Sequence, residues 1–526
     1  MRIDLNGCLL ANAEVGSLFS VKSSGNLSIV DSDPERDTGE DFLVTLGMKS
    51  EDDTGSRKYH LTGGGIFHGG SEESGGAVRI EPGGEMSVEG CTFTDCHSAE
   101  NGGAIFCEGK LTLKGTKFIY CTALEGNGGA ICVSDRPEIS LENLTFERCS
   151  AENGGAISFE NDMTRGVVSK FDNCTFNRCV AEEYGGACYN IGRNNITASG
   201  LTFSQCAAEY GGGVYITSGG TQFDSTSYPL TISSSRFENC SATESGGGIG
   251  YHNAAELTLD NVEFNGCKCE EHGGAIYILP HHVWGRNDQR SEDICIKNSK
   301  IHHCSANEKG GAVYVFDEGG SNYINKTILY KTSVHDNTAK TGAGMYVESR
   351  YVYLVGSSIT NNQAKSKNGG GVYVDSMYDI EVAEEVVIRD NTANGAANNI
   401  CLQNGVASTA YMYCGGLYDG SYIGLSSTGG SSITAVKNIS QYQANKFIHA
   451  DDHERKLSIT NTKEVATPLF ASMISDNISL IIIIGGVIVI AGVIVILYLR
   501  KRKKEGKNED EAKAKQTDTK IDEKNQ

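Results

Sequence analysis

The chain has 526 residues, with 65 glycines, only 6 prolines and a formal net charge of −21. A single compact core rarely grows beyond about 300 residues, so this length indicates several domains or one elongated repeat. Abundant glycine with little proline excludes collagen and proline-rich disorder, and the acidic excess argues against nucleic-acid binding.

The first residues, Met1 to Asn6, include no apolar segment and no plausible cleavage site, so no signal peptide is visible. Residues 26–30 (Asn-Leu-Ser-Ile-Val) already alternate like a strand. We therefore expect the printed chain to begin inside the fold.

A repeat follows over residues 75–397. Each copy has the pattern Phe-x-x-Cys, small residues, an acidic residue and then Gly-Gly-Ala-Ile, and successive copies start 25 to 37 residues apart. A fixed motif with variable spacing is typical of a solenoid with constant corners and loops of different length. The copies start at Phe93, Phe118, Phe146, Phe176, Phe203, Phe237, Phe264, Ile301, Val334, Ile359 and Ile388.

Within each copy, apolar residues alternate with period two, as at Leu111 and Leu113, which predicts strands. We expect no helix before the predicted membrane span. Three residues before each start stands a residue that tolerates positive φ, so we predict a left-handed corner there. These residues are Gly90, Gly115, Asn143, Asn173, Gly200, Ser234 and Asn261. The predicted fold class is all-β, a right-handed parallel β-helix.

Stacked coils place equivalent residues above one another, so each motif position becomes a column. One column is a structural ladder: Cys96, Cys121, Cys149, Cys179, Cys206, Cys240, Cys267, Cys304, Asn337, Asn362 and Asn391. Its cysteines pack in the interior or, as the alternative, form some strained disulfides, because in-register neighbours are farther apart than a relaxed disulfide prefers.

A second column is acidic, one residue per coil before the glycine pair: Glu100, Glu125, Glu152, Glu182, Glu209, Glu244, Glu270 and Glu308. Later coils carry Lys340, Lys365 and Lys367 there. Stacked like charges repel, so this edge is a candidate to bind divalent cations such as Ca²⁺ or a basic partner; the plainer alternative is a merely soluble edge.

An acid that every coil carries is a property of the edge and not of one catalytic pair, so we expect no enzyme and no catalytic residue. His281-His282 and His302-His303 have no ligand partners at regular spacing, so we expect no metal site and no cofactor apart from Ca²⁺.

Beyond the repeats, residues 398–461 are predicted to form terminal coils that complete a β-helix ectodomain at 1–461, followed by a linker at 462–477. Residues 478–499 are 22 apolar residues, which at about 1.5 Å each span about 33 Å, enough for one transmembrane helix. The basic run Arg500–Lys504 predicts a cytosolic, disordered tail at 500–526 and a single-pass plasma-membrane protein with its N-terminal part outside. Candidate glycosylation sites are Asn143, Asn173, Asn195, Asn239, Asn325 and Asn438.

The repeated Gly-Gly-Ala and Phe-x-x-Cys/Asn motifs, over residues 75–397, resemble the polymorphic membrane proteins of chlamydiae and their counterparts in trichomonad-type parasites. This chain has an apolar span and lysine-rich tail where the bacterial proteins have a β-barrel, so it is more similar to the eukaryotic members. The resemblance implies a pectin-lyase-like β-helix displayed on a cell surface, with adhesion as its role.

Three functions follow as hypotheses. The first is an adhesin or binding scaffold for host cells, matrix or glycans. The second is a structural or antigenic coat without a specific ligand, and the third a carbohydrate-active lyase or hydrolase. The sequence does not specify the oligomeric state.

Overall fold

A computed structural model describes residues 1–6, 9–11, 17–33, 37–45, 56–62, 66–68, 70–71, 73–135, 138–160, 168–191, 195–217, 229–252, 256–280, 293–317, 326–404, 410–428, 432–451 and 456–459. The chain divides into two units, Met1–Asn461 and Thr462–Gln526. The predicted linker, span and tail all lie outside the described residues. Within the described part, no helix has the length and apolar character needed to cross a bilayer.

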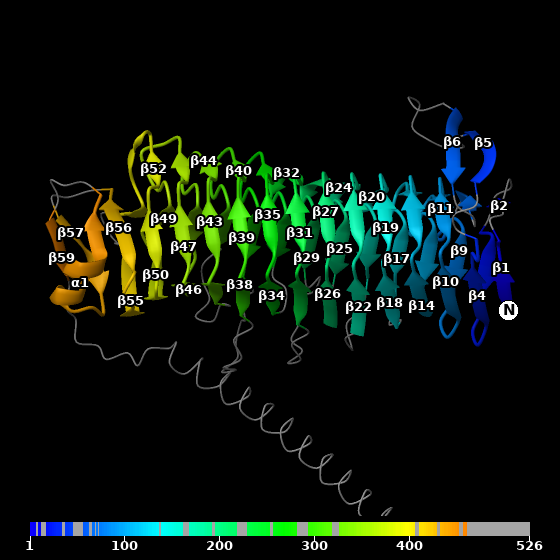
Figure 1. Cartoon of the computed structure of the whole chain (residues 1–526), viewed down its shortest axis with the longest axis horizontal. Coiled ribbons are helices and arrows are strands. Elements are labelled where there is room, and N and C mark those ends of the chain that lie inside the picture. The colour runs from blue at the N-terminus through cyan, green and yellow to red at the C-terminus, as the bar shows by residue number, and fades with distance from the viewer. Residues whose placement is uncertain are drawn as a thin grey trace, which may run out of the picture. The chain divides into compact units, whose positions relative to one another are not determined.

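The first unit is a parallel β-helix, as the repeat predicts. One coil consists of four strands, for example β14 (Lys110–Lys114), β15 (Lys117–Ile119), β16 (Thr122–Ala123) and β17 (Ile131–Val133). Most strands pair in parallel and in register with their counterparts in the next coil; Leu111 faces Ile139, and Phe118 faces Phe146. Figure 1 shows the coils following one another from β1 at one end to β59 at the other.

The first strands of the coils form a 16-stranded sheet, sheet A. Its order is β1 (Arg2–Asp4), β4 (Asn26–Val30), β10 (Glu85–Glu89), β14, β18 (Ile139–Glu142), β22 (Val168–Asp172), β26 (Asn195–Ser199), β30 (Leu230–Ser233), β34 (Leu257–Asp260), β38 (Ile294–Lys297), β42 (Thr327–Tyr330), β46 (Val352–Val355), β50 (Asp379–Glu384), β55 (Tyr411–Leu417), β57 (Ser432–Lys437) and β59 (Lys456–Ile459).

The second and fourth strands form the 28-stranded sheet B, and the short third strands form the 13-stranded sheet C. Sheet B contains β2 (Leu9–Ala11), β3 (Phe19–Val21), β7 (Ile66–His68), β9 (Val78–Ile80), β11 (Thr92–Thr94), β13 (Ile105–Cys107), β15, β17, β19 (Thr145–Glu147), β21 (Ile157–Phe159), β23 (Thr175–Asn177), β25 (Cys188–Ile191), β27 (Thr202–Ser204), β29 (Val214–Thr217), β31 (Arg236–Glu238), β33 (Ile249–His252), β35 (Glu263–Asn265), β37 (Ile276–Leu279), β39 (Lys300–His302), β41 (Val313–Phe316), β43 (Ser333–His335), β45 (Met345–Glu348), β47 (Ser358–Thr360), β49 (Val372–Val374), β51 (Val387–Arg389), β54 (Ile400–Leu402), β56 (Tyr422–Ser427) and β58 (Ile448–Ala450). Sheet C contains β8 (Gly70–Ser71), β12 (His97–Ser98), β16, β20 (Ser150–Asn153), β24 (Val180–Tyr184), β28 (Ala207–Tyr210), β32 (Ser241–Ser245), β36 (Lys268–Cys269), β40 (Ser305–Ala306), β44 (Thr338–Ala339), β48 (Gln363–Ala364), β52 (Thr392–Ala393) and β53 (Ala396–Ala397).

Three features differ from the sequence prediction. β53 pairs antiparallel with β52. β5 (Asp37–Thr45) and β6 (Ser56–Thr62) pair antiparallel and form an insertion within one coil, between its first strand β4 and its second strand β7. A helix, α1 (Gln441–Phe447), precedes β58, although none was expected before the membrane span. Its seven residues are too few to give a helical period, and its start is set locally because the Ser440 hydroxyl accepts the backbone N–H of Gln443.

The interior is filled by stacked side chains. The rings of the seven repeat phenylalanines lie with centroids 4.5–5.0 Å apart and planes within 13° of parallel. All seven are fully buried, and Ile301, Val334, Ile359 and Ile388 continue the column in the later coils. Burial of a large apolar side chain in every coil is the main force that holds the coils together.

The predicted left-handed corner is confirmed, because all seven residues named for it have φ between +47° and +75°. Each coil also has left-handed backbone two residues after the start and at the first glycine of the pair. The second position after the start was missed because residues such as Tyr120, Arg148 and Gln205, which rarely adopt positive φ, occupy it in several coils.

Candidate binding face: the acid column and the side-chain ladders

The acidic edge lies beside sheet C. The residue before each glycine pair stacks on its counterpart in the next coil: Tyr184 pairs with Tyr210, Tyr210 with Ser245, Ser245 with His272, and His272 with Lys309. The preceding residues therefore also stack, about 4.8 Å apart. They form a set that we name the acid column: Glu152, Glu183, Glu209, Glu244, Glu271 and Glu308.

The prediction placed Glu125, Glu182 and Glu270 at this edge, but each is displaced by one position from the column. Some coils have one extra residue between the start of the third strand and the glycine pair. The coils of β24 and β32 have it and the coils of β20 and β28 do not, so the register shifts between β20 and β24, between β24 and β28, and between β28 and β32. In the coil of Glu125, Gly126 takes the column position, next to Glu100. Counting back two residues from the first glycine identifies the correct members.

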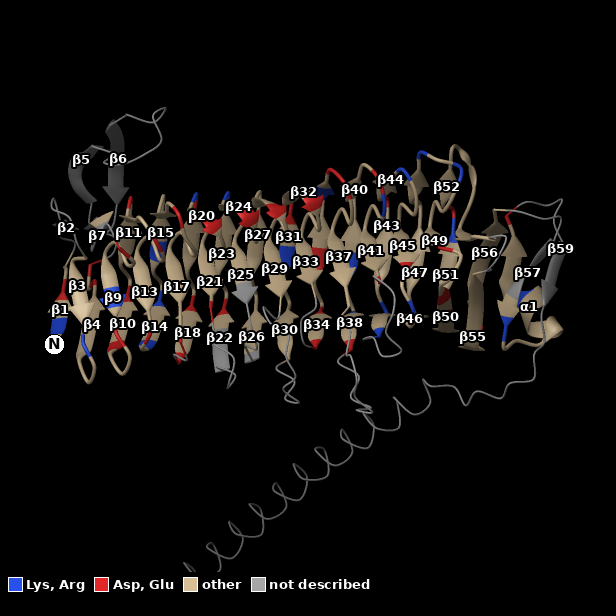
Figure 2. Cartoon of the chain, turned by 180° about the vertical axis from the view of Figure 1, so that it is seen from behind, with Lys and Arg blue, Asp and Glu red and all other residues tan. Residues whose placement is uncertain are grey.

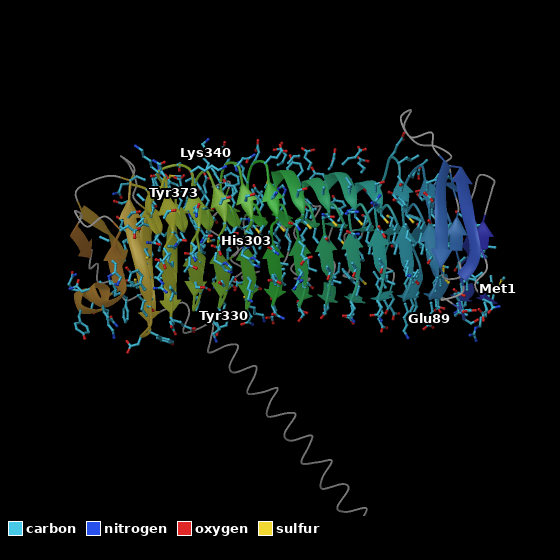
Figure 3. All side chains as sticks on the ribbon, turned by 45° about the horizontal axis from the view of Figure 1, so that its top comes forward. Met1, Glu89, His303, Tyr330, Lys340 and Tyr373 are labelled. Carbon is cyan, nitrogen blue, oxygen red and sulfur yellow. The ribbon has the colours of Figure 1, made fainter. Side chains whose placement is uncertain are left out.

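Like charges lie together in the middle of the acid column. Burial raises the pKa of Glu244 above its ordinary value, and the carboxylates of Glu271 and Glu209 raise it further. After Glu308 the column position is held by Lys340, whose Nζ lies 2.7 Å from Oε2 and 3.0 Å from Oε1 of Glu308. Figure 2 shows acidic residues beside β24 and β32 and basic residues beside β44, and Figure 3 shows Lys340 at this edge.

Tyrosines lie beside the acid column. The Tyr184 ring stacks on Tyr210 with centroids 5.2 Å apart and lies 4.7 Å from the ring of Tyr215. Burial raises the pKa of Tyr210 to about 12, and the Glu209 and Glu244 carboxylates contribute to the shift. Because Tyr184 and Tyr210 are partly exposed, a partner at this edge would meet both carboxylates and aromatic rings.

Three coils beyond Tyr210, the same kinds of group already hold an ammonium. The Nζ of Lys309 lies 4.7 Å from the ring centroid of Tyr346 and 5.4 Å from that of Tyr314, and it pairs with Oε2 of Glu348 at 2.9 Å. The Tyr314 hydroxyl donates to the same carboxylate oxygen at 2.6 Å. Cation–π attraction and ion pairing act together here.

The structure places the predicted cysteine ladder in the interior. Each thiol from Cys121 to Cys304 donates to the carbonyl of the start residue one coil earlier, at 3.6–3.8 Å. The backbone N–H of Cys96 donates to the Cys121 sulfur, and the same contact recurs from Cys121 to Cys149. Figure 3 shows the sulfur atoms following one another along the stack. All cysteines that the structure describes are free thiols.

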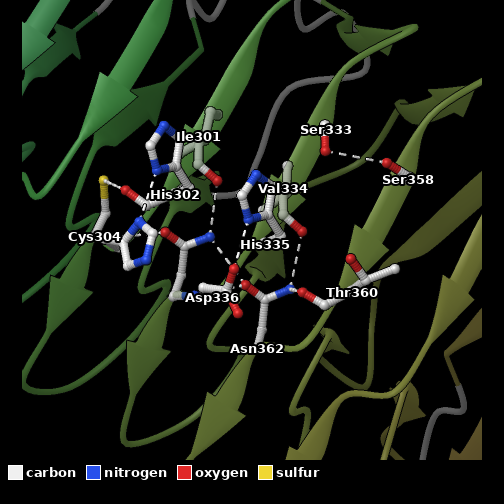
Figure 4. Close-up of polar contacts among 12 residues, drawn as sticks. Ile301, His302, Cys304, Ser333, Val334, His335, Asp336, Ser358, Thr360 and Asn362 are labelled. Carbon is white, nitrogen blue, oxygen red and sulfur yellow. Dashed lines mark hydrogen bonds and ion pairs between the residues drawn. The ribbon is translucent and has the colours of Figure 1, made fainter.

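The asparagines at the end of this ladder make the same contacts with an amide. Asn337 donates from Nδ2 to the Ile301 carbonyl at 3.0 Å, and Oδ1 of Asn337 accepts the backbone N–H of Cys304 at 2.9 Å. Figure 4 shows this arrangement around Asn362. After Asn391 the series passes to Asn399, whose amide donates to the partly buried carboxylate of Asp451.

The histidines make a small surface cluster. His302 Nε2 lies 3.1 Å from Glu263 Oε1, and its ring stacks on His335 with centroids 5.1 Å apart. His303 Nδ1 lies 2.7 Å from His302 Nδ1. Among the residues that the structure describes, no group of three or more His, Cys, Asp or Glu could hold a metal ion. His281 and His282 lie outside those residues.

Four of the candidate glycosylation residues, Asn143, Asn173, Asn239 and Asn438, are exposed and have φ between +53° and +61°. All four therefore occupy left-handed backbone positions at the surface. Asn195 begins β26, and Asn325 lies outside the described residues.

The sequence analysis missed a group of carboxyls on the outer face of sheet A. Burial, followed by the Asp293 carboxylate, raises the pKa of Glu256, and burial raises that of Glu381. Tyr353 pairs in register with Glu381, and burial, Glu381 and Asp293 raise its pKa. No repeated motif marks these residues; a carboxylate just before two successive sheet A strands was the available signal.

Two overlapping stretches of the chain, residues 66–228 and 103–282, match the protein family described as right handed beta helix region. With the parallel sheets described above, this match shows a right-handed parallel β-helix. No curated protein and no solved structure matches the chain. A β-helix does not by itself specify an activity, so function depends on the side chains that this fold displays.

Proposed function

We propose that this chain is an adhesin-like binding scaffold at a cell surface, and that its acid column binds a basic segment of a partner protein. One observation carries the proposal. Glu183, Glu209 and Glu244 stack in register, and no described Lys or Arg forms an ion pair with them, whereas Lys340 neutralises Glu308 in the same column.

Stacked carboxylates repel one another; after burial, the Glu271 and Glu209 carboxylates are the next causes that raise the pKa of Glu244. An ammonium or guanidinium group between two coils would relieve this repulsion. Lys340 beside Glu308, and Lys309 between two tyrosine rings and a carboxylate, are examples of such contacts within this chain. Tyr184 and Tyr210 would add cation–π attraction at the unoccupied coils.

Charge also discriminates among the partners proposed from the sequence. A column of carboxylates repels sulfated or carboxylated glycans and attracts Lys- or Arg-rich polypeptide, so a basic host-cell or matrix protein is favoured over an acidic glycan. Display outside the cell rests on the apolar run at 478–499 with its basic flank, and on the resemblance to the polymorphic membrane proteins, whose proposed role is adhesion.

The test uses the full chain in vesicles and a lysine-rich peptide as probe. A triple variant, Glu209→Gln, Glu244→Gln and Glu271→Gln, should weaken binding about tenfold at low salt, and binding of the unmodified chain should fall as salt increases. The control triple, Glu85→Gln, Glu142→Gln and Glu385→Gln, removes the same charge from exposed positions outside the column and should bind normally.

Equal losses in both triples would assign the effect to net charge and refute a specific site. Binding to cells or matrix that does not depend on salt would also refute it. If no cell or matrix component binds, the chain is a coat without a specific ligand. Competition by Ca²⁺ would show that the column takes divalent cations as well as basic side chains.

A second candidate function, action on carbohydrate, is favoured by the carboxyls of sheet A. Half-buried carboxyl groups with a raised pKa, such as Glu256 and Glu381, can serve as general acids. Turnover of an acidic polysaccharide that is lost in Glu256→Gln or Glu381→Gln would establish this function, and absence of turnover in the unmodified chain would exclude that substrate.

A further inference from the structure

Exposed aromatic rings gather at one end of the β-helix. Four of the large exposed hydrophobic residues that the structure describes are aromatic, and three of them belong to the last coils: Tyr418, Tyr422 and Tyr442, which are 59%, 40% and 80% exposed. Elsewhere many tyrosines are covered, and Tyr314 and Tyr346 are exposed by only 3% and 5%. Since most large rings are packed away, this end needs a separate explanation.

An ion pair joins the segments that carry Tyr418 and Tyr442. Lys446 on α1 forms an ion pair with Asp419, which follows Tyr418, so the helix is fixed against the loop between β55 and β56. Tyr442 lies one helical turn before Lys446 and hence on the same face of α1. The opposite face is buried through Ala444 and Phe447.

The remaining ring, Tyr422, stacks on His449 with centroids 4.2 Å apart. Asp419 on this surface is paired with Lys446, and the exposed carboxylate of Glu385 lies beside Gly420, between Tyr418 and Tyr422. Aromatic rings that carry a polar hydroxyl have the chemistry of residues found at membrane–water interfaces.

The chain leaves the β-helix at this same end. β59 ends at Ile459, and Figure 1 shows α1, β57 and β59 together in the last coils. Eighteen residues separate Ile459 from the apolar run that begins at Ile478. A segment of this length spans at most about 60 Å even when fully extended, so of all the coils the last ones are joined to the apolar run by the shortest stretch of chain.

We infer that the C-terminal end of the β-helix docks on the lipid bilayer that anchors the chain, with Tyr418 and Tyr442 in the headgroup layer. This inference rests on the membrane anchor of the proposed function but does not depend on the acid column. It places the acid column on a stack that stands on the membrane by its last coils.

Tryptophan reporters test the inference. In full chain reconstituted into phosphatidylcholine vesicles, with Trp284 replaced by Phe, the variants Tyr418→Trp and Tyr442→Trp each supply one fluorophore. Lipids brominated near the headgroup should quench both and shift their emission to the blue. Tyr351→Trp is the matched control, because Tyr351 is 42% exposed and lies just before β46, four strands of sheet A away from β59. It should remain unquenched.

Vesicle flotation distinguishes failure of the docking inference from failure of the membrane anchor on which the proposed function rests. If the chain floats with the vesicles but Tyr418→Trp and Tyr442→Trp emit like Tyr351→Trp, the docking inference is overturned and the anchor stands. If the chain does not float, the membrane anchor and the docking inference are both refuted. Unquenched reporters together with dimers crosslinked through α1 would assign this surface to a second copy of the chain and would also overturn the inference.

Discussion

Asn337 donates from Nδ2 to Oδ1 of Asn362 in the next coil at 2.9 Å, and both side chains are fully buried. The same Oδ1 accepts the backbone N–H of Asn337 at 3.0 Å. In the earlier coils a cysteine sulfur accepts the backbone N–H and its thiol donates to the carbonyl one coil back. Cysteine and asparagine replace one another in this ladder because each has an acceptor and a donor at the right distance from the backbone.

Asn362→Ala should therefore be strongly destabilising. It leaves the Asn337 N–H and the carbonyls of Val334 and Thr360 without their partners in a dry interior, at a cost of about 3 kcal/mol or more. Asn362→Cys keeps one acceptor and one donor and should cost less. Urea midpoints of the full chain in detergent measure both variants, and equal losses would contradict the proposed equivalence.

Glu244→Gln should stabilise the protein at neutral pH by a few tenths of a kcal/mol. Because the folded-state pKa is raised, the folded chain binds the proton more tightly than the unfolded chain. Stability is then lost as pH rises above the ordinary Glu value, and the penalty is complete above the folded-state pKa. The variant should lack this decline and match the unmodified chain in acid. Glu308→Gln, which removes the partner of Lys340, should give no gain at pH 7. Urea unfolding midpoints measured from pH 3 to pH 8 show whether Glu244→Gln raises or lowers the stability of the protein.

Gly154→Ala should cost about 3 kcal/mol or more, because its φ is +63° and an added Cβ would lie 2.4 Å from the Ile157 carbonyl oxygen. The control is Gly395→Ala. Gly395 also has positive φ, +78°, but an added Cβ there meets nothing within 4 Å, so only the backbone cost of about 1 kcal/mol remains. Thermal melts of both variants test the difference. Similar decreases in melting temperature would show that close packing at the glycine pair contributes little to stability.

Alkylation should distinguish Cys295 from the ladder cysteines. Cys295 is only partly covered and lies on the outer face of sheet A, whereas Cys121 and Cys149 are fully buried. Burial raises the pKa of Cys295 to about 11, two units above the ordinary 9.0, so at pH 8 it holds about 100-fold less thiolate than a free cysteine. Mass spectrometry after iodoacetamide treatment should show slow labelling of Cys295 that accelerates with pH. Labelling of the ladder cysteines should require denaturant, and their reaction in the folded chain would contradict the packing described.

The repeat was sufficient to predict the coils, the phenylalanine stack and one corner, because those features depend on residues that recur at fixed positions. Glu182 and Glu270 were misplaced because a single inserted residue moves a side chain by one position, and counting forward from the ladder does not detect it. The antiparallel pair of β5 and β6 and helix α1 occur once each, so no repeated sequence pattern predicts them.

The side-chain contacts of the candidate binding face could be predicted from the sequence to a smaller extent than the fold. Nothing in the sequence shows that Lys309 lies between Tyr314 and Tyr346, since Tyr346 belongs to the next coil and meets Lys309 only through the register. The carboxyls of sheet A were also missed. Their pKa values are raised by burial, and the sequence does not reveal how far a polar residue in or beside a strand is buried.

Among the described residues, strand hydrogen bonds join each coil to the coils directly before and after it, and a few side chains, such as Tyr378 with the Asp317 carbonyl, reach across two coils. Duplication of one coil in the gene would therefore lengthen the β-helix by a single strand spacing and disturb contacts mainly where the new copy enters. Loss of a coil would be equally local. Such a protein can change its length during evolution in small steps, without redesigning its core.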